Sequence, residues 1–267
     1  MNKNDKISVV MPARDSGGTI RATIESILNQ TLKPYEVIII ASKNDNTRKA
    51  IGDYLYNNSV KYFELDNLQE YYRDAHIKRW HGAQKSKGNF IFFTDSKAIL
   101  DEKALSNSLK LAKEHNVEVV AGTVLSWAED TNSFISKVQD KGLIRNNPKF
   151  PKVGKLNKNN FGLTESLPVT TALFVSRNAF DKIEHDFGLE YSKIASTYDD
   201  YVTAWLLVNE GFEILVTNTV ISYHKHRTSW KNYLKQISRS GQSAALMAKY
   251  YPECPYAQLQ LAGNLRL

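Results

Sequence analysis

Short apolar runs alternate with stretches of helical periodicity through the first third of the chain. The apolar runs occupy residues 7–11, 35–40 and 90–94, and residues 60–65 are expected to form a further strand. Runs of this kind are typical of strands that are buried on both faces of a parallel sheet. Between them, apolar residues recur at helical spacing over residues 20–28, 50–55 and 71–86. The pattern predicts βαβ units, and therefore an α/β fold with a mostly parallel sheet flanked by helices.

The rest of the chain continues this pattern but also contains two segments of different character. We expect helices over residues 102–114, 178–183 and 198–210, and strands over residues 117–122, 172–176, 212–217 and 220–223. Residues 141–168 are rich in Lys, Asn, Pro and Gly, and they predict a basic loop that either closes over a substrate or extends into solvent. Residues 229–250 predict a long amphipathic helix whose apolar stripe includes Trp230 and Leu234. The chain is therefore divided into a main domain, 1–226, and a C-terminal helical extension, 227–267.

An acid follows directly after the apolar run at residues 90–94. Right-handed crossovers place the carboxyl ends of parallel strands at one edge of the sheet, so the loops after Met11, Ile40 and Thr94 are expected to converge. Asp95 begins the last of these loops. A carboxylate in this position suits catalysis or metal binding, although an acid at the end of a strand also commonly caps the following loop. The sequence thus predicts a nucleotide-sized crevice with Asp95 at its edge.

The charge balance favours anionic partners. The 267 residues include 35 Lys and Arg against 28 Asp and Glu, which gives a net charge of +7. Nucleotides and anionic lipids fit such a charge, and a lysine-rich solvated surface is the alternative. The sequence contains no recognised nucleic-acid motif, so nucleic acid is not an expected partner. The single cysteine, Cys254, excludes an intramolecular disulfide and a cysteine metal cluster.

The location expected from the sequence is cytoplasmic, either free or at the inner face of the membrane. No run of 18 apolar residues is present, and the first residues lack the apolar region of a signal peptide. Between Lys225 and Lys249 there are six Lys or Arg residues and no acid. A basic amphipathic helix can lie on an anionic membrane surface, and packing of this helix against the main domain is the alternative.

Four segments carry chemistry-bearing residues in a recurrent order and spacing. They are residues 7–30 with Val9-Val-Met-Pro-Ala-Arg-Asp15, Tyr35-Glu-Val-Ile-Ile-Ile40, residues 82–95 with Phe92-Phe-Thr-Asp95, and Tyr198-Asp-Asp200 continuing to Tyr223-His224. Together they resemble the inverting glycosyltransferases of family 2, which have the GT-A fold. The resemblance implies transfer of a sugar from a nucleotide-sugar donor to a hydroxyl of a glycan, lipid-linked or polymer acceptor. It also implies that residues 1–98 bind the nucleotide and residues 99–226 bind the acceptor.

The resemblance further implies residue roles that match the chemistry. The donor-binding residues would be Pro12, Ala13, Arg14, Asp15, Ser42, Arg79, Asp95 and Lys97. An acceptor hydroxyl needs a base to take its proton, and Asp199 or, preferably, Asp200 would be that base. The departing diphosphate needs positive charge from side chains or from Mg²⁺ or Mn²⁺. Asp95 would hold the metal, and His224 would complete its site.

Each assigned role has a plainer alternative. Asp199 and Asp200 would equally satisfy the N-terminus of a helix. His224 and Arg14 are also compatible with ordinary surface positions. Arg79 is adjacent to Trp80 and would alternatively stack on an aromatic ring.

Two positions depart from the family pattern. The family commonly follows its second strand with two aspartates and a glycine, the first acid reading the nucleobase, whereas this chain has Ala41-Ser42-Lys43. Asp45 matches a later acid of that loop, so UDP is in doubt as the donor nucleotide. The family often has Asp-x-Asp at the metal site, whereas this chain has Asp95-Ser96-Lys97, which puts the metal requirement in doubt. Either Lys97 neutralises donor phosphate, or it points to solvent, or the protein has lost catalysis and acts as a nucleotide- or glycan-binding module.

Overall fold

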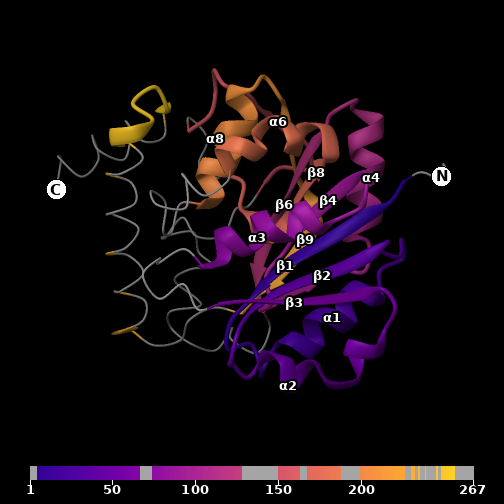
Figure 1. Ribbon diagram of the computed structural model, residues 1–267. Helices are drawn as coiled ribbons and strands as arrows, with labels where there is room; N and C mark the ends of the chain where they lie inside the picture. Colours follow the sequence, from indigo (N-terminus) through magenta and orange to yellow (C-terminus); the bar gives the residue numbers. More distant parts are fainter. Residues whose placement is uncertain are drawn as a thin grey trace.

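The computed structural model describes the chain in segments, and its core is one mixed sheet with helices on both faces (Figure 1). The described residues are 5–66, 74–127, 150–162, 167–187, 199–225, 230–231, 234, 238, 245 and 248–255. The strand order is β3-β2-β1-β4-β8-β6-β9-β5, with β7 paired to β9. This arrangement confirms the α/β fold that the apolar pattern predicts.

The first half of the sheet is parallel. Its strands are β1 (Ile7–Ala13), β2 (Glu36–Ser42), β3 (Val60–Leu65) and β4 (Phe90–Phe93). The connecting elements are α1 (Ile20–Leu28), α2 (Thr47–Ile51) with the 3-10 helix η1 (Gly52–Tyr56), and α3 (Asp74–Lys85). β1 pairs in parallel with both β2 and β4, so the three strands end at the same edge. The predicted strands lie within two residues of these bounds.

The second half of the sheet is mixed. Its elements are β5 (Ala98–Leu100), α4 (Ala104–Glu114), β6 (Val119–Ser126), β7 (Gly154–Leu156), the 3-10 helix η3 (Thr170–Ala172), β8 (Leu173–Ser176), α6 (Arg177–Phe187), α8 (Asp199–Asn209) and β9 (Ile214–His224). β8 runs antiparallel to β4 and β6, whereas β6 and β9 are parallel. β8 therefore joins the two halves of the sheet.

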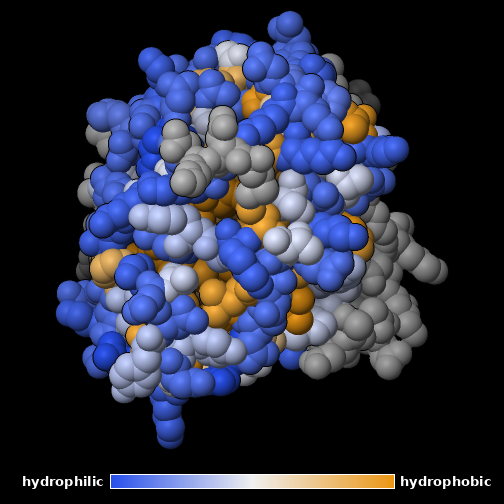
Figure 2. Space-filling view, turned by 90° about the vertical axis from the view of Figure 1, so that its right-hand side faces the viewer, coloured by the Kyte–Doolittle hydropathy of each residue, from blue (hydrophilic) through white to orange (hydrophobic). Residues whose placement is uncertain are grey.

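Both faces of the sheet are buried, which explains the uninterrupted apolar runs. Alternate residues of a strand point to opposite faces. Val10 and Phe93 lie in a cluster with residues of α3, α6 and α8, whereas Val9 and Phe92 lie in a second cluster with residues of α1 and α4. Seen from the side where the chain begins, the surface is mainly hydrophilic with small recessed apolar areas (Figure 2).

The structure corrects two predictions about secondary structure. The strands predicted at 212–217 and 220–223 form the single strand β9, whose register on β6 shifts between Gly122 and Thr123. A Cβ atom on Gly122 would lie 2.4 Å from the carbonyl oxygen of Val220, so the irregular pairing requires glycine. Part of the predicted basic loop is ordered as β7, where Lys155 forms an ion pair of 2.5 Å with Glu213. Residues 141–149 and 163–166 of that prediction lie outside the described residues.

The predicted C-terminal helix also lies largely outside the described residues. Trp230 and Leu234, two members of its predicted apolar stripe, are 53% and 59% exposed. Within the described part of the chain, no helix is long and apolar enough to cross a membrane.

Candidate active site at the carboxyl edge of the sheet

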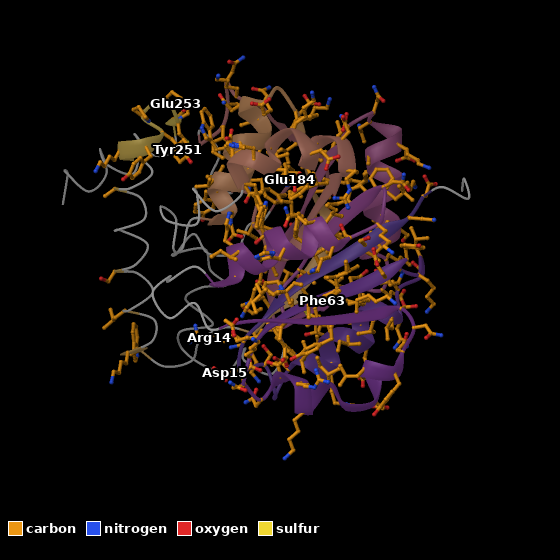
Figure 3. The ribbon with its side chains drawn as sticks, viewed as in Figure 1. Arg14, Asp15, Phe63, Glu184, Tyr251 and Glu253 are labelled. Atoms are coloured by element: carbon orange, nitrogen blue, oxygen red, sulfur yellow. The ribbon has the colours of Figure 1, made fainter. Side chains whose placement is uncertain are left out.

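The loops that follow β1, β2 and β4 meet at the carboxyl edge, as the parallel order predicts. The backbone N–H of Asp15 donates a hydrogen bond of 2.9 Å to the carboxylate of Asp45. The hydroxyls of Ser16 and Ser96 are 2.7 Å apart. Arg14 and Asp15 lie together at this edge, and both are exposed (Figure 3). The edge therefore gathers the donor-binding positions expected after β1 with the loop that carries Asp95.

Asp45 has a structural part in this arrangement. Besides Asp15, its carboxylate accepts a hydrogen bond of 2.8 Å from the backbone N–H of Thr47. Asn46 acts similarly, because its side-chain oxygen accepts a bond of 2.8 Å from the backbone N–H of Gly17. Two side chains of the loop after β2 thus hold the backbone of the loop after β1.

A buried lysine connects the ends of β1 and β2. Lys78 on α3 is only 1% exposed. Its ammonium group donates hydrogen bonds of 2.7 Å to the carbonyl oxygen of Ala13 and 2.6 Å to the hydroxyl of Ser42. The sequence prediction includes Ala13 and Ser42 but misses Lys78, because nothing in the helical pattern distinguishes this lysine from a solvated one. Pro12 is buried within β1, opposite Ile40 of β2.

Asp95 lies just beyond β4 within a set of positive and polar groups. Nη2 of Arg79 donates a hydrogen bond of 2.6 Å to Oδ1, and the hydroxyl of Thr171 donates one of 2.7 Å to Oδ2. Nε2 of His224 is 3.7 Å from Oδ2. The side chain of Arg79 is 5% exposed and that of Asp95 is 23% exposed. Arg79 thus pairs with Asp95. Neither the predicted donor binding of Arg79 nor its alternative stacking on an aromatic ring anticipates this contact.

The pKa of Asp95 reflects these neighbours. Burial by itself raises the pKa of the carboxyl group, but the charges of Arg79 and His224 and the hydrogen bonds from Thr171 and Arg79 outweigh burial. The net effect lowers the pKa of Asp95 below its usual value of 3.8. Asp95 is therefore an anion at neutral pH, and it can attract a cation.

Asp200, at the start of α8, is held by η3. Its Oδ1 accepts a hydrogen bond of 2.8 Å from the backbone N–H of Thr170 and a second bond from the Thr170 hydroxyl. The neighbouring residue, Thr171, bonds Asp95. Consecutive threonines therefore bring the expected base and the expected metal-binding acid together. The side chain of Asp199 lies outside what the structure describes.

Lys97 lies at the outer part of the same edge. Its side chain is exposed, and it has no hydrogen bond or ion pair among the residues that the structure describes. Its carbonyl oxygen accepts a hydrogen bond of 2.9 Å from the backbone N–H of Lys225, which follows His224. The ammonium group of Lys225 is 5.5 Å from the ring centroid of Trp127. Two lysines and an indole ring therefore lie beside Asp95 and His224.

The side chains at this edge fit a metal only if other ligands complete its shell. Within the described segments, no three His, Cys, Asp or Glu side chains are grouped so that they can hold a metal ion. Asp95 and His224 supply one oxygen and one nitrogen atom near each other. Mg²⁺ is commonly bound by one or two protein carboxylates together with substrate phosphates. The pair therefore fits a cation that is shared with a diphosphate, and it does not fit an all-protein site.

The sheet order and the convergent loops define an α/β fold of the GT-A type. The fold is similar to that of Staphylococcus aureus TarS 1-349 solved in complex with UDP-GlcNAc, with a TM-score of 0.64 and 15% identity over 91% of this chain and 66% of that chain. It is also similar to that of the mannosyltransferase PcManGT of Pyrobaculum calidifontis, solved with GDP-Man and Mn²⁺, with a TM-score of 0.61 and 14% identity over 95% of this chain and 68% of that chain.

The chain belongs to glycosyl transferase family 2, since the model of that family matches residues 8–183 of 267. One relative, the poly(ribitol-phosphate) beta-N-acetylglucosaminyltransferase TarP of Staphylococcus aureus (strain N315), is 35% identical over 120 residues. The matched part covers 44% of this chain and 36% of TarP, so the similarity spans about a third of that relative's length. The chain thus carries the family 2 domain that the sequence resemblance implies.

Proposed function

We propose that this family 2 protein is a glycosyltransferase that moves a sugar from a nucleotide-sugar donor to an acceptor hydroxyl with inversion at the anomeric carbon. The observation that supports the proposal is the placement of Asp95 and Asp200 on adjacent threonines of η3, at the edge where the loops after β1, β2 and β4 meet. Asp95 then holds the cation that neutralises the donor diphosphate, and Asp200 takes the proton of the acceptor hydroxyl.

In the proposed reaction, Asp200 acts as the general base. Its carboxylate takes the proton of the acceptor hydroxyl while the acceptor oxygen forms a bond to the anomeric carbon. The bond from that carbon to the diphosphate oxygen breaks on the opposite face, and its electron pair leaves with the nucleoside diphosphate. Attack opposite the leaving group inverts the configuration. Asp200 then releases its proton to solvent.

Asp200→Asn tests this role directly. We expect the substitution to lower the rate of sugar transfer about 10²–10⁴-fold, which is the usual contribution of a general base. Donor affinity, measured by calorimetry, should stay within about threefold, because Asp200 does not contact the donor in the proposed reaction. Asp186→Asn, at an exposed acid on α6, is the matched control. An unchanged transfer rate in Asp200→Asn would exclude this residue as the base.

Positive groups at the carboxyl edge would stabilise the departing diphosphate. Asp95 and His224 would hold Mg²⁺ or Mn²⁺ together with the phosphate oxygens, and such an ion supplies Lewis-acid neutralisation of the leaving group. Arg79 keeps Asp95 ionised and oriented for this purpose. Lys97, which stands where the family often has a second acid, would contribute an ammonium group to the same phosphates.

Lys97→Ala and a chelator separate the two sources of positive charge. If Lys97 neutralises donor phosphate, its loss should reduce kcat/KM at least about tenfold, the effect of one charged hydrogen bond. The matched control is Lys110→Ala, at a lysine on α4 that is 68% exposed. Abolition of activity by the chelator, with full activity in Lys97→Ala, would show that the metal alone acts on the diphosphate.

The donor nucleotide is best found by a screen. The fold neighbours are bound to different nucleotides, UDP-GlcNAc in one case and GDP-Man in the other. In this chain Ser42, bonded to Lys78, occupies the region where the family commonly has its base-reading acid. Calorimetry with UDP, GDP, CDP and ADP sugars, with and without Mn²⁺, would identify both the base and the metal requirement.

For the acceptor, we propose an anionic glycan polymer in preference to a neutral one, with a lipid-linked glycan as the other candidate. The relative TarP is named for transfer to poly(ribitol-phosphate), and Lys225 and Trp127 offer a cation and an aromatic ring beside the proposed site. Transfer to an anionic polymer should weaken steeply as salt rises, because screening acts on exposed charges. Transfer to a neutral glycan that equals it at every salt concentration would contradict this choice.

An anionic membrane surface is the further partner that the sequence suggests. Trp230 and Leu234 are exposed, and Lys231 lies between them in sequence. Exposed apolar and basic groups together suit an anionic leaflet. Co-sedimentation with phosphatidylglycerol vesicles but not with phosphatidylcholine vesicles would support peripheral binding, and equal recovery without vesicles would exclude it.

A non-catalytic binding module is the second candidate function. The loss of the base-reading acid, where this chain has Ala41-Ser42-Lys43, and of the second metal ligand, where it has Lys97, favours it. Hydrolysis of the bound donor by the wild-type chain, abolished in Asp200→Asn, would exclude this candidate. Tight donor binding without turnover in either protein would establish it.

A further inference from the structure

The two carboxylates of the proposed site are attached to one short turn, η3. The hydroxyl of Thr171 donates to Oδ2 of Asp95, and both the backbone N–H and the hydroxyl of Thr170 donate to Oδ1 of Asp200. Thr170 is 1% exposed and Thr171 is 7% exposed. Threonine hydroxyls that are buried this deeply need partners, and here the partners are charged oxygens.

The sheet register places Thr171 beside Asp95. β4 and β8 are antiparallel, and Phe93 pairs with Leu173. Residues that follow β4 therefore lie opposite residues that precede β8. Two steps beyond the last pair, Asp95 on one side meets Thr171 on the other. The register thus brings Asp95 and Thr171 together just beyond the paired residues of β4 and β8.

The preceding residue of the turn, Thr170, bonds the other carboxylate. Thr170 meets the first turn of α8, where Asp200 lies, and supplies two donors to the same oxygen. The two bonds to Oδ1 restrain the orientation of the Asp200 carboxylate. Each hydrogen bond to a charged group is worth roughly 10–100-fold in an equilibrium, so the bonds are strong enough to fix orientation.

We propose that Thr170 and Thr171 are paired positioning residues that set the base and the donor-phosphate carboxylate at a fixed spacing. The inference rests on the proposed roles of Asp200 and Asp95. Thr170 acts through Asp200 and therefore on the chemical step. Thr171 acts through Asp95 and therefore on the binding of the donor diphosphate with its cation.

Valine and serine substitutions at the two positions provide the test. Valine keeps the branched shape and removes the hydroxyl, whereas serine keeps the hydroxyl. Thr170→Val should lower kcat about tenfold with the donor KM within twofold, since one donor to the base is lost. Thr171→Val should instead weaken Mn²⁺-dependent binding of UDP and GDP about tenfold by calorimetry. Both serine variants should stay within about threefold of the wild-type protein, because the hydroxyl is retained.

Thr123→Val is the matched control. Thr123 is buried in β6, and its hydroxyl donates to the backbone oxygen of Thr217, away from the two carboxylates. We expect this variant to lower the melting temperature without separating kcat from nucleotide affinity. A purely structural role of Thr170 and Thr171 would give the same result in all three valine variants, and that outcome would overturn the proposal.

The two readouts distinguish failure of the inference from failure of the proposed function. An active wild-type protein whose Thr170→Val and Thr171→Val variants show no split between kcat and affinity would refute the inference alone. An inactive wild-type protein would refute the proposed catalysis. In that case, equal nucleotide affinity of the wild-type protein and Thr171→Val would refute the positioning role as well, whereas weaker binding in Thr171→Val would retain it for Asp95.

Discussion

At the scale of single residues, the ion pair between Asp95 and Arg79 is the least replaceable contact of the site. Both side chains are largely buried, and their oxygen and nitrogen atoms are 2.6 Å apart. Removing one partner of such a pair leaves a buried charge without compensation. The sequence predicts that both residues bind the donor, but it cannot show that they bind each other, because they lie on different elements. Lys78, Thr170 and Thr171 escape prediction for the same reason: their partners are set by register and packing and not by local pattern.

Asp95→Asn should destabilise the protein most at neutral pH. We expect a loss of roughly 3 kcal/mol in the free energy of unfolding, because Arg79 stays buried without its partner. The folded-state pKa of Asp95 is lowered, so its contribution is fully present above the unfolded-state value and disappears as pH falls through the folded-state value. The difference in the free energy of unfolding between wild type and variant should therefore narrow below about pH 4. Urea unfolding between pH 7 and pH 3, with chelator present, measures it, and a gap that is constant with pH would contradict this reasoning.

At the scale of elements, close approach of α3 to the sheet positions both Lys78 and Arg79. A Cβ atom on Gly82 would lie 2.4 Å from Cγ1 of Val10 and 3.3 Å from Cγ1 of Ile40. Only glycine lets the helix lie this near β1 and β2. The positions of the first strands are predictable because they are buried on both faces and read as apolar runs. β9 is less predictable, because its polar Asn218 and Thr219 interrupt the run where the pairing with β6 is irregular.

Gly82→Ala should move α3 away from the sheet. Overpacking of this kind costs about 1–3 kcal/mol, and the better helix propensity of alanine returns about 1 kcal/mol of it. We expect a net loss of stability together with weaker nucleotide binding, because Lys78 and Arg79 move with the helix. Gln84→Ala, at an exposed position of α3, should change stability and nucleotide affinity only slightly. Thermal unfolding and calorimetry on both variants check this, and a stabilised Gly82→Ala with full affinity would show that the helix shifts freely.

At the scale of the whole molecule, strand topology brings distant parts of the sequence to one edge. Residues after β1, β2, β4 and β9 and before β8 all contribute, although they span from residue 14 to residue 225. The parallel half of this arrangement is predictable from the alternation of strands and helices. The antiparallel insertion of β8 between β4 and β6 is not, because a short buried strand carries no mark of its direction.

Nucleotide binding should stabilise the whole fold, since the residues proposed to bind the nucleotide and its cation are distributed along the chain from Pro12 to His224. A nucleotide present at 100 times its dissociation constant adds about 2.7 kcal/mol to the free energy of unfolding. For a chain of this size, that corresponds to a rise of roughly 5–10 °C in the melting temperature. Thermal unfolding with UDP, GDP, CDP and ADP in turn, each with Mn²⁺, measures the shift, and no shift with any of them would argue against a preformed nucleotide site.

The side-chain bonds that Asp45 and Asn46 make to the backbone of the first loop have a consequence for affinity. Asp15 there adopts φ of 47°, a left-handed conformation that a free chain rarely visits. Because the loop is held in this shape before any ligand arrives, little conformational entropy remains to be lost when a nucleotide binds. Nucleotide binding should then be fast, with little contribution from ordering of the loop after β1. Sequence changes in the loop after β2 should alter nucleotide affinity without contacting the nucleotide.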